Sequence, residues 1–217
     1  MAHQQTGQGA RDDPRSGVFV AAARLLAYPD EALGALLPEV EAYLRALPAS
    51  EPVSALVGVA ERLHAMSVVE LEALYVATFD FDESAALYLT AHELGDSRRR
   101  GQALIELRRL LRAAGFEQAT AELPDYLPLL LEFLAQAPAA PAPIPEGVQD
   151  PIDALERRLA AVCERIAGRL STDNPYCDLF AALRGLFPTP EETNTERRFS
   201  QREQADTGEM PYPLHYD

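Results

Sequence analysis

The sequence contains no lysine and no tryptophan, so all 19 of its basic residues are arginines. Without lysine the chain cannot form a Schiff base with a carbonyl compound, and it cannot supply the phosphate-contacting lysine of a Walker-type loop. Enzyme classes that depend on such a lysine, including those that anchor a cofactor through it, are therefore excluded.

Cysteines and long apolar runs are equally scarce. Cys163 and Cys177 are the two cysteines of the chain, and they form neither a CxxC pair nor a cluster with histidine. A zinc site or a thioredoxin-type redox pair is therefore not indicated, and we expect buried, reduced thiols. No apolar run approaches the roughly 18 residues of a membrane span, and the polar start lacks a signal-peptide segment. We expect a cytoplasmic protein that does not insert into membranes.

Acidic residues outnumber basic ones by 34 to 19, which leaves a net charge of -15. This charge repels phosphates, so it argues against nucleic acid and anionic membrane surfaces as partners and favours a basic one. The stretches between Arg62 and Arg98 and between Arg112 and Arg157 contain acidic residues but no arginine. If their helices lie side by side, they present a negative surface that orients an arginine-bearing peptide. The alternative is a set of ordinary solvated helix faces.

Apolar residues recur at three- and four-residue steps, and no segment alternates like a strand followed by a hairpin turn. This pattern predicts an all-α fold, a single-domain antiparallel bundle of about eight to ten helices. Ser16 and Asp30 are expected to cap the first two helices, and Pro38 to bend or restart the second. Helices are expected, among others, at 18–26, 30–47, 52–66, 69–79, 84–94, 98–114 and 152–170.

The chain is expected to have one helical domain between two tails. Residues 1–17 predict a disordered N-terminal tail, 18–188 the helical domain, and 189–217 a largely disordered C-terminal tail. Within the domain, 136–151 is rich in proline and alanine and predicts a loop or semi-rigid linker.

Two pairs of carboxylates have the three-residue spacing by which one helix can hold Mg²⁺, Glu93 with Asp96 and Glu122 with Asp125. Gly95 and Pro124 interrupt these pairs, so each is expected to straddle a helix end. The sequence therefore predicts no catalytic residue, no metal ligand and no cofactor. A Mg²⁺-dependent all-α nucleotide pyrophosphohydrolase and a generic helical scaffold protein are the alternative functions.

Three segments together carry a resemblance to a known family: Tyr75–Phe81 (YVATFDF), Leu87–Leu104 (LYLTAHELGDSRRRGQAL) and Glu122–Leu134 (ELPDYLPLLLEFL). They resemble the nitrate reductase molybdenum cofactor assembly chaperones, often called the delta subunit, within the wider group of redox-enzyme maturation chaperones. The resemblance extends from about Val18 to Pro188. The wider group commonly has histidine where this chain has Tyr126.

The resemblance implies a chaperone, not an enzyme, that carries no cofactor of its own. It implies binding to the N-terminal segment of the apo catalytic (alpha) subunit of respiratory nitrate reductase, and assistance with molybdenum cofactor insertion before membrane docking. Molybdenum cofactor insertion proteins are further implied partners. We expect the client segment to enter a groove as a helix, with its cations against a negative rim. The candidate groove or rim residues are Asp80, Asp82, Tyr88, His92, Asp125, Tyr126 and Glu132.

Some of these residues have alternative roles. Asp125 could instead cap a helix by accepting the amide of Leu127, and Tyr88 could belong to the core. Arg98 to Arg100 oppose the dipole at the start of a helix, which points to a use elsewhere, such as contact with an acidic part of the client or with cofactor phosphates. The alternative for these arginines is a solvated helix start.

Overall fold

Helices form nearly all of the regular structure in residues 14–118, 121–137 and 149–187, which are the residues that the computed structural model describes. All of them belong to one unit, which ends at Phe187. Their α-helices are α1 (Pro14–Leu25), α2 (Glu31–Ala46), α3 (Glu51–His64), α4 (Val68–Tyr75), α5 (Leu89–Leu94), α6 (Arg99–Ala113), α7 (Leu127–Gln136), α8 (Gln149–Ala167) and α9 (Pro175–Leu186). A π-helical turn, η2 (Val76–Asp80), continues α4, and a 3₁₀ turn, η3 (Glu83–Ala85), follows it. The all-α prediction is confirmed.

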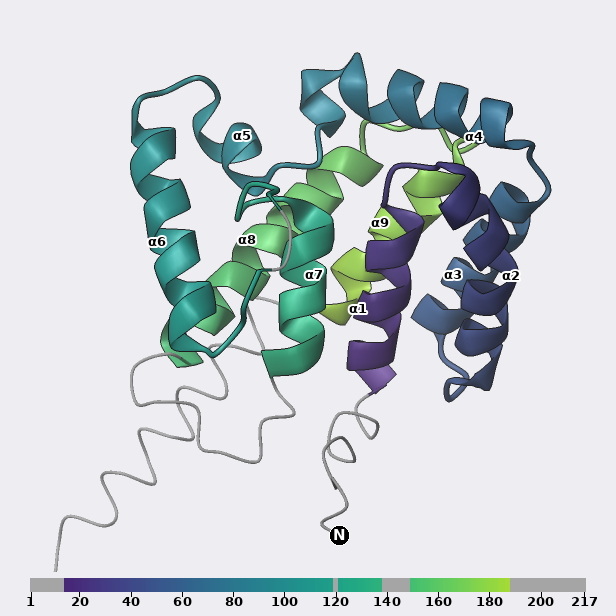
Figure 1. Ribbon diagram of the computed structural model, residues 1–217, viewed down its shortest axis with the longest axis horizontal. Coiled ribbons are helices and arrows are strands. Elements are labelled where there is room, and N and C mark those ends of the chain that lie inside the picture. Colours follow the sequence, from purple (N-terminus) through teal and green to yellow (C-terminus); the bar gives the residue numbers. More distant parts are fainter. Residues whose placement is uncertain (1–13, 119–120, 138–148, 188–217) are drawn as a thin grey trace, which may run out of the picture. The chain divides into compact units, whose positions relative to one another are not determined.

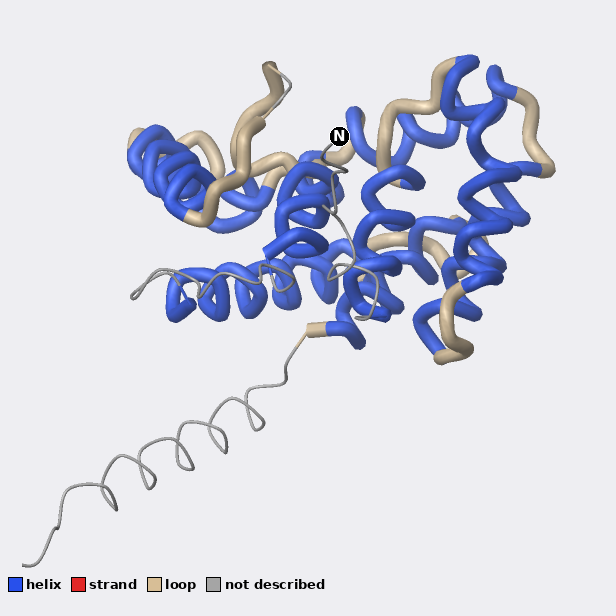
Figure 2. Tube along the Cα trace, turned by 60° about the horizontal axis from the view of Figure 1, so that its bottom comes forward, coloured by secondary structure: helices blue, strands red, loops and turns tan. Residues whose placement is uncertain are grey.

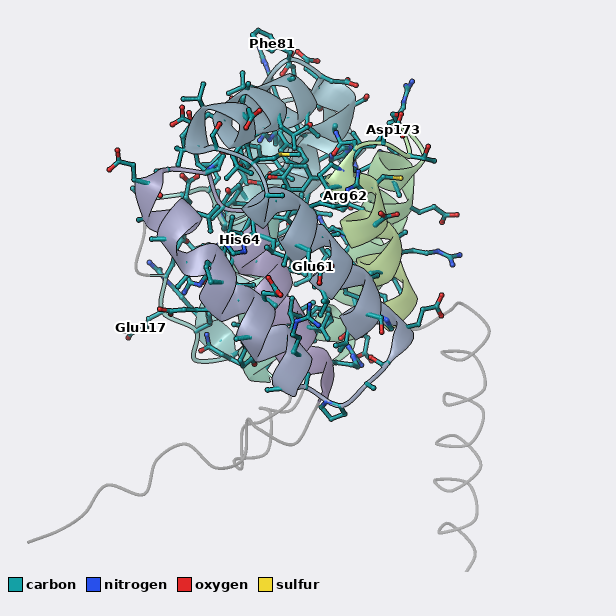
Figure 3. The ribbon with its side chains drawn as sticks, turned by 90° about the vertical axis from the view of Figure 1, so that its right-hand side faces the viewer. Glu61, Arg62, His64, Phe81, Glu117 and Asp173 are labelled. Atoms are coloured by element: carbon teal, nitrogen blue, oxygen red, sulfur yellow. The ribbon has the colours of Figure 1, made fainter. Side chains whose placement is uncertain are left out.

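The helices pack around a central pair, α1 and α7, which lie side by side (Figure 1). α2 packs against α1 and α3, and α9 packs against both α3 and α8. Arg62 of α3 strengthens the contact with α9, because it donates to Asp178 at 3.1 Å and to the carbonyl of Asp173 (Figure 3). α6 lies at the opposite margin of the bundle from α2 and α3, and its main helix neighbour is α5 (Figures 1 and 2).

α7 is the most apolar of the longer helices of the bundle. Its buried residues are Leu127, Pro128, Leu129, Leu130, Leu131, Phe133, Leu134 and Ala135. Glu132 is the polar exception before the exposed end of the helix at Gln136. A helix of this composition gains its stability from burial on most sides, which explains its central position against α1.

Several helix boundaries follow the local signals in the sequence. Asp30 caps α2, because its Oδ1 accepts the amide of Leu33 at 2.8 Å. Gly95 ends α5 with a φ of 53°, a backbone conformation that glycine adopts without a Cβ penalty. The apolar stripe predicted for α8 is buried at Ile152, Leu155, Leu159, Val162 and Ile166.

Other boundaries differ from the prediction. Ser16 does not cap the first helix, because α1 already begins at Pro14 and Ser16 is buried inside it. Pro38 does not restart α2 as a separate helix, since α2 runs through it. Pro38 is exposed, so the hydrogen bond that it removes lies toward solvent.

Most of the predicted tails and loop lie outside the described residues, which omit 1–13, 119–120, 138–148 and 188–217. Where they overlap, residues 14–17 are part of α1, and 149–151 are part of α8. Within the described ranges, no helix is both long and apolar enough to cross a membrane.

Candidate functional site

Segments that lie far apart in the sequence meet at the start of α7. The amide of Leu89 donates to the carbonyl of Asp125, and the amide of Leu127 donates to the carbonyl of Leu87, both at 2.9 Å. These bonds flank an antiparallel bridge between Tyr88 and Tyr126. Because the bridge requires an extended backbone, the helix predicted over 84–94 is replaced by η3, an extended link and the short α5.

Asp125 is completely buried beside this bridge. Its Oδ2 accepts hydrogen bonds from the backbone amide of Thr90 at 3.3 Å and from the Thr90 hydroxyl, and it lies 3.5 Å from Nη2 of Arg100. Its Oδ1 is buried with no hydrogen-bond partner among the described residues. A buried carboxylate needs such donors, because desolvating an unpaired charge is very costly. Asp125 therefore ties α5 and α6 to the start of α7.

Arg100 connects the same cluster to an aromatic ring. Its Nε donates to the Thr90 hydroxyl at 3.1 Å, and its guanidinium lies 5.9 Å from the centroid of the Tyr88 ring. This position combines hydrogen bonding with a cation–π contact. Arg100 lies on the first turn of α6, where its charge opposes the helix dipole, and its use is the pairing with Asp125.

The predicted capping role of Asp125 is wrong. The N-cap of α7 is Tyr126, whose side chain makes no capping hydrogen bond. The amide of Leu127 is already bonded to the carbonyl of Leu87, and Pro128 has no amide hydrogen to satisfy. The side chain of Asp125 turns instead toward Thr90 and Arg100.

The hydroxyls of Tyr75 and Tyr126 meet at the end of α1. They lie 3.4 Å apart, and both donate to the carbonyl of Leu26, at 3.3 Å from Tyr75 and 3.5 Å from Tyr126. The carbonyls at the end of a helix lack partners within the helix, so the two phenols satisfy one of them. Burial raises the pKa of both tyrosines, which keeps the phenols protonated and able to donate.

Four aromatic rings, Tyr28, Tyr75, Tyr88 and Tyr126, form a continuous set that we call the tyrosine surface. Tyr28 packs edge-on against Tyr75 with centroids 5.3 Å apart, and the Tyr88 and Tyr126 centroids are 5.5 Å apart. Tyr75 is buried, whereas Tyr28 is exposed and Tyr88 and Tyr126 are half-buried. Rings with one accessible side and a polar tip are well suited to contact a partner.

Two carboxylates border the tyrosine surface, and we call Asp80 and Glu122 its acidic rim. Glu122 accepts from the hydroxyl of Tyr88 at 3.5 Å. Asp80, at the end of η2, is close enough to Tyr126 to act on it electrostatically. After burial, the largest cause, the negative charges of Glu122 and Asp80 also raise the pKa of Tyr126.

Phe81 follows Asp80 and projects from the molecule with 82% of its surface exposed (Figure 3). Asp82, on its other side, is a structural cap: its Oδ1 accepts the amide of Ser84 at 2.9 Å. The hydrogen bonds from Ser84 lower the pKa of Asp82. This short segment therefore presents an aromatic ring between two carboxylates.

The structure brings together Asp80, Tyr88, Asp125 and Tyr126 of the predicted site residues. His92 makes a different contact: it donates through Nε2 to the carbonyl of Ala86 at 2.6 Å, and burial lowers its pKa.

Glu132, on α7, is 3.6 Å from Nη2 of Arg24 on α1. The sequence alone does not reveal the roles of Tyr28 and Thr90 or the internal pairing of Arg100, because these contacts join residues distant in the chain. The arginines that oppose the dipole of α6 were the one local signal in the sequence that pointed to a role for Arg100.

The carboxylates of the proposed Mg²⁺ pairs are engaged otherwise. Glu93 forms a bidentate ion pair with Arg158, with N–O distances of 2.7 and 2.6 Å. Glu122 is exposed, whereas Asp125 is buried and bonded to Thr90. Among residues 14–118, 121–137 and 149–187, no three or more His, Cys, Asp or Glu side chains are grouped as metal ligands. Among these residues, the two carboxylate pairs that could favour a nucleotide pyrophosphohydrolase are therefore not part of a group of metal ligands.

Comparison with known proteins identifies the family of this chain. A family model described as nitrate reductase delta subunit matches residues 29–165. The probable nitrate reductase molybdenum cofactor assembly chaperone NarJ of Bacillus subtilis is 34% identical over 170 residues, which cover 78% of this chain and 87% of that protein. The nitrate reductase molybdenum cofactor assembly chaperone NarJ of Escherichia coli is 39% identical over 175 residues, which cover 79% of this chain and 70% of that protein.

A solved structure has the same fold. It is a putative redox enzyme maturation protein from Archaeoglobus fulgidus, with a TM-score of 0.54, 16% identity, and coverage of 85% of this chain and 98% of that one. The chain therefore belongs to the nitrate reductase delta subunit family, a family of assembly chaperones and not of enzymes.

Proposed function

We propose that this maturation chaperone is dedicated to respiratory nitrate reductase and binds the N-terminal segment of the apo catalytic (alpha) subunit. It assists insertion of the molybdenum cofactor before the catalytic subunit docks at the membrane. The names of the relatives from Bacillus subtilis and Escherichia coli support the client and the cofactor. We also place this step in the cytoplasm and propose molybdenum cofactor insertion proteins as further partners, on the family resemblance.

The observation that carries the proposal is the tyrosine surface with its acidic rim. It lies where the three segments with the family resemblance converge, and it combines accessible rings with the carboxylates of Asp80 and Glu122. An amphipathic client helix would lay its apolar side on the rings and direct its cations toward the rim. The apolar contact would set affinity, whereas the rim would mainly set orientation and association rate.

In this proposal Asp125 builds the surface and does not touch the client. It has no exposed atoms, and it holds Arg100, which lies over the ring of Tyr88. Asp82, His92 and Glu132 are left with structural roles. The contacting groups are Tyr28, Tyr88, Tyr126, Phe81 and the acidic rim.

Isothermal titration calorimetry with a synthetic peptide of the client's N-terminal segment tests the proposal. Phe81→Ser should weaken binding by roughly tenfold or more, because burying a phenylalanine contributes about 1.5–3 kcal/mol. Val69→Ser is the matched control, since Val69 is also highly exposed but lies on α4 away from η2. Absence of heat with the wild-type protein, or equal loss in the two variants, would reject the proposal.

A second pair of variants tests the rim. Asp80→Asn with Glu122→Gln should weaken binding at low salt and have little effect at high salt, because exposed charges are screened. Glu39→Gln with Glu164→Gln removes the same charge from exposed positions on α2 and α8 and should leave binding unchanged. A salt-independent loss, or an equal effect of the control pair, would show that the rim does not receive the client's cations.

A further inference from the structure

The region of α6 has a net positive charge, opposite in sign to the net charge of the chain. Residues 98–112 contain six arginines and one acidic residue, Glu106, in a protein whose net charge is -15. Arg100 is used internally with Asp125. The other five, Arg98, Arg99, Arg108, Arg109 and Arg112, are all exposed.

These five arginines lack partners in the described part of the chain, where their side chains make no hydrogen bond or ion pair. Arginines on other helices are mostly paired with carboxylates, as are Arg24 with Glu132 and Arg158 with Glu93. Pairing with a carboxylate is therefore common among the described arginines outside α6, and five of the six arginines at residues 98–112 depart from it.

Three of the unpaired arginines, Arg98, Arg109 and Arg112, share one side of the helix. The buried residues of α6 are Leu107 and Leu111, on the side that faces the bundle. At about 100° per residue, Arg98, Ile105, Arg109 and Arg112 project from the opposite side. Ile105 is 47% exposed in the middle of this stripe. α6 lies at the margin of the bundle in two views (Figures 1 and 2), and the residues of this side are exposed in the described part of the chain.

A hollow adjoins the same helix. It has a volume of about 660 Å³, and its walls include Arg108, Arg112, Leu111 and Phe116. Glu117 and Glu122 complete part of its border. Arg108 and Arg112 are four residues apart on the helix, a spacing at which like charges repel. An acidic ligand would relieve this repulsion.

We propose that the outward side of α6 (Arg98, Ile105, Arg109 and Arg112), together with Arg108 beside it, docks an acidic amphipathic helix of a partner protein. Its carboxylates would pair with the guanidinium groups, and an apolar residue between them would contact Ile105. A long polyanion such as DNA would meet the strongly acidic remainder of the protein, whereas a short helix meets only this side. The site has the opposite charge preference to the acidic rim, and Glu122, which belongs to that rim, also borders the hollow beside α6.

Fluorescence anisotropy tests this docking with a labelled acidic probe. The probe is a peptide of about 16 residues, the length of α6 at about 1.5 Å per residue, with Glu at most positions and Leu at every third or fourth. The variant Arg108→Gln with Arg109→Gln and Arg112→Gln should bind it roughly tenfold more weakly at low salt. The control, Arg45→Gln with Arg169→Gln and Arg184→Gln, removes three exposed arginines from other elements and should bind like the wild type. Ile105→Ala should weaken binding at low and high salt alike, because its contact is apolar.

Three results would overturn the proposal. They are failure of the wild-type protein to bind the probe, an equal loss in the two triple variants, and tighter binding of a DNA duplex of about 20 base pairs or of phosphatidylglycerol vesicles than of the probe. All substituted residues are exposed, so circular dichroism should show unchanged folding in each variant.

Discussion

We expect Asp125→Ala to lower the free energy of unfolding by about 3 kcal/mol. The substitution removes the acceptor of the Thr90 amide and hydroxyl and the ion-pair partner of Arg100. A hydrogen bond to a charged group contributes about 1.5–3 kcal/mol, and a buried donor that loses its partner adds a penalty of about 1–3 kcal/mol. The side chain of Arg100 is 27% exposed, so water compensates part of its loss, and the total stays below the simple sum.

Chemical denaturation followed by circular dichroism measures the loss in free energy, and thermal denaturation measures the corresponding change in Tm. In a domain of this size about 1 kcal/mol corresponds to roughly 2–4 °C in Tm, so we expect a decrease of about 6–12 °C. Glu132→Ala is the matched control, because Glu132 is a partly exposed carboxylate on α7 that lies 3.6 Å from Arg24. It should cost at most about 0.5 kcal/mol. A loss in Asp125→Ala no larger than in this control would refute the reasoning.

A double-mutant cycle isolates the ion pair. Asp125→Asn keeps an acceptor for Thr90 but removes the charge, and Arg100→Gln removes the guanidinium. We expect the two losses to be non-additive by about 1 kcal/mol, since paired groups in one network couple. Additivity within about 0.3 kcal/mol would mean that the 3.5 Å contact contributes no stability.

Three further results are expected. Asn174→Ala should cost about 1 kcal/mol in denaturation experiments, because its Oδ1 caps the first turn of α9; no loss would contradict the capping role. Burial lowers the pKa of His92 below its unfolded value of about 6.5, so its stabilising contribution is present above that pH and is lost as the pH falls through the folded pKa. The free energy of unfolding should therefore fall less between about pH 7 and pH 5 in His92→Gln than in the wild type or in His64→Gln, and equal slopes would contradict this. Burial raises the pKa of Cys163 to about 12, so a thiol reagent should modify half-buried Cys177 in the native protein and Cys163 only after unfolding, and rapid native modification of both would oppose this.

Local patterns in the sequence were sufficient to predict most helices. The stripe from Ile152 to Ile166 and the apolar run of α7 are repeated signals, and burial of a whole face follows from them. The cap at Asp30 acts within three residues, so it is equally visible in the sequence. Such features depend only on neighbours along the chain.

The cluster at the start of α7 could not be predicted in the same way. Asp125 has the residue type and position of a helix cap, yet its oxygen is bound to Thr90 and Arg100, which are 35 and 25 residues away. The helix predicted over 84–94 was interrupted by a bridge to Tyr126, also distant in the chain. In both cases a tertiary contact replaced the local preference. Which side of α6 is open likewise depends on where Leu107 and Leu111 are buried.

The tyrosine surface also allows binding to be followed by the intrinsic fluorescence of the protein. The chain has eight tyrosines and no tryptophan, so its ultraviolet emission comes mainly from the phenol rings of tyrosine. Half of these fluorophores, Tyr28, Tyr75, Tyr88 and Tyr126, lie within this single set of rings. A ligand without aromatic residues that binds there would change the emission of the unlabelled protein, and one that docks on the outward side of α6, a helix without tyrosine, would change it less.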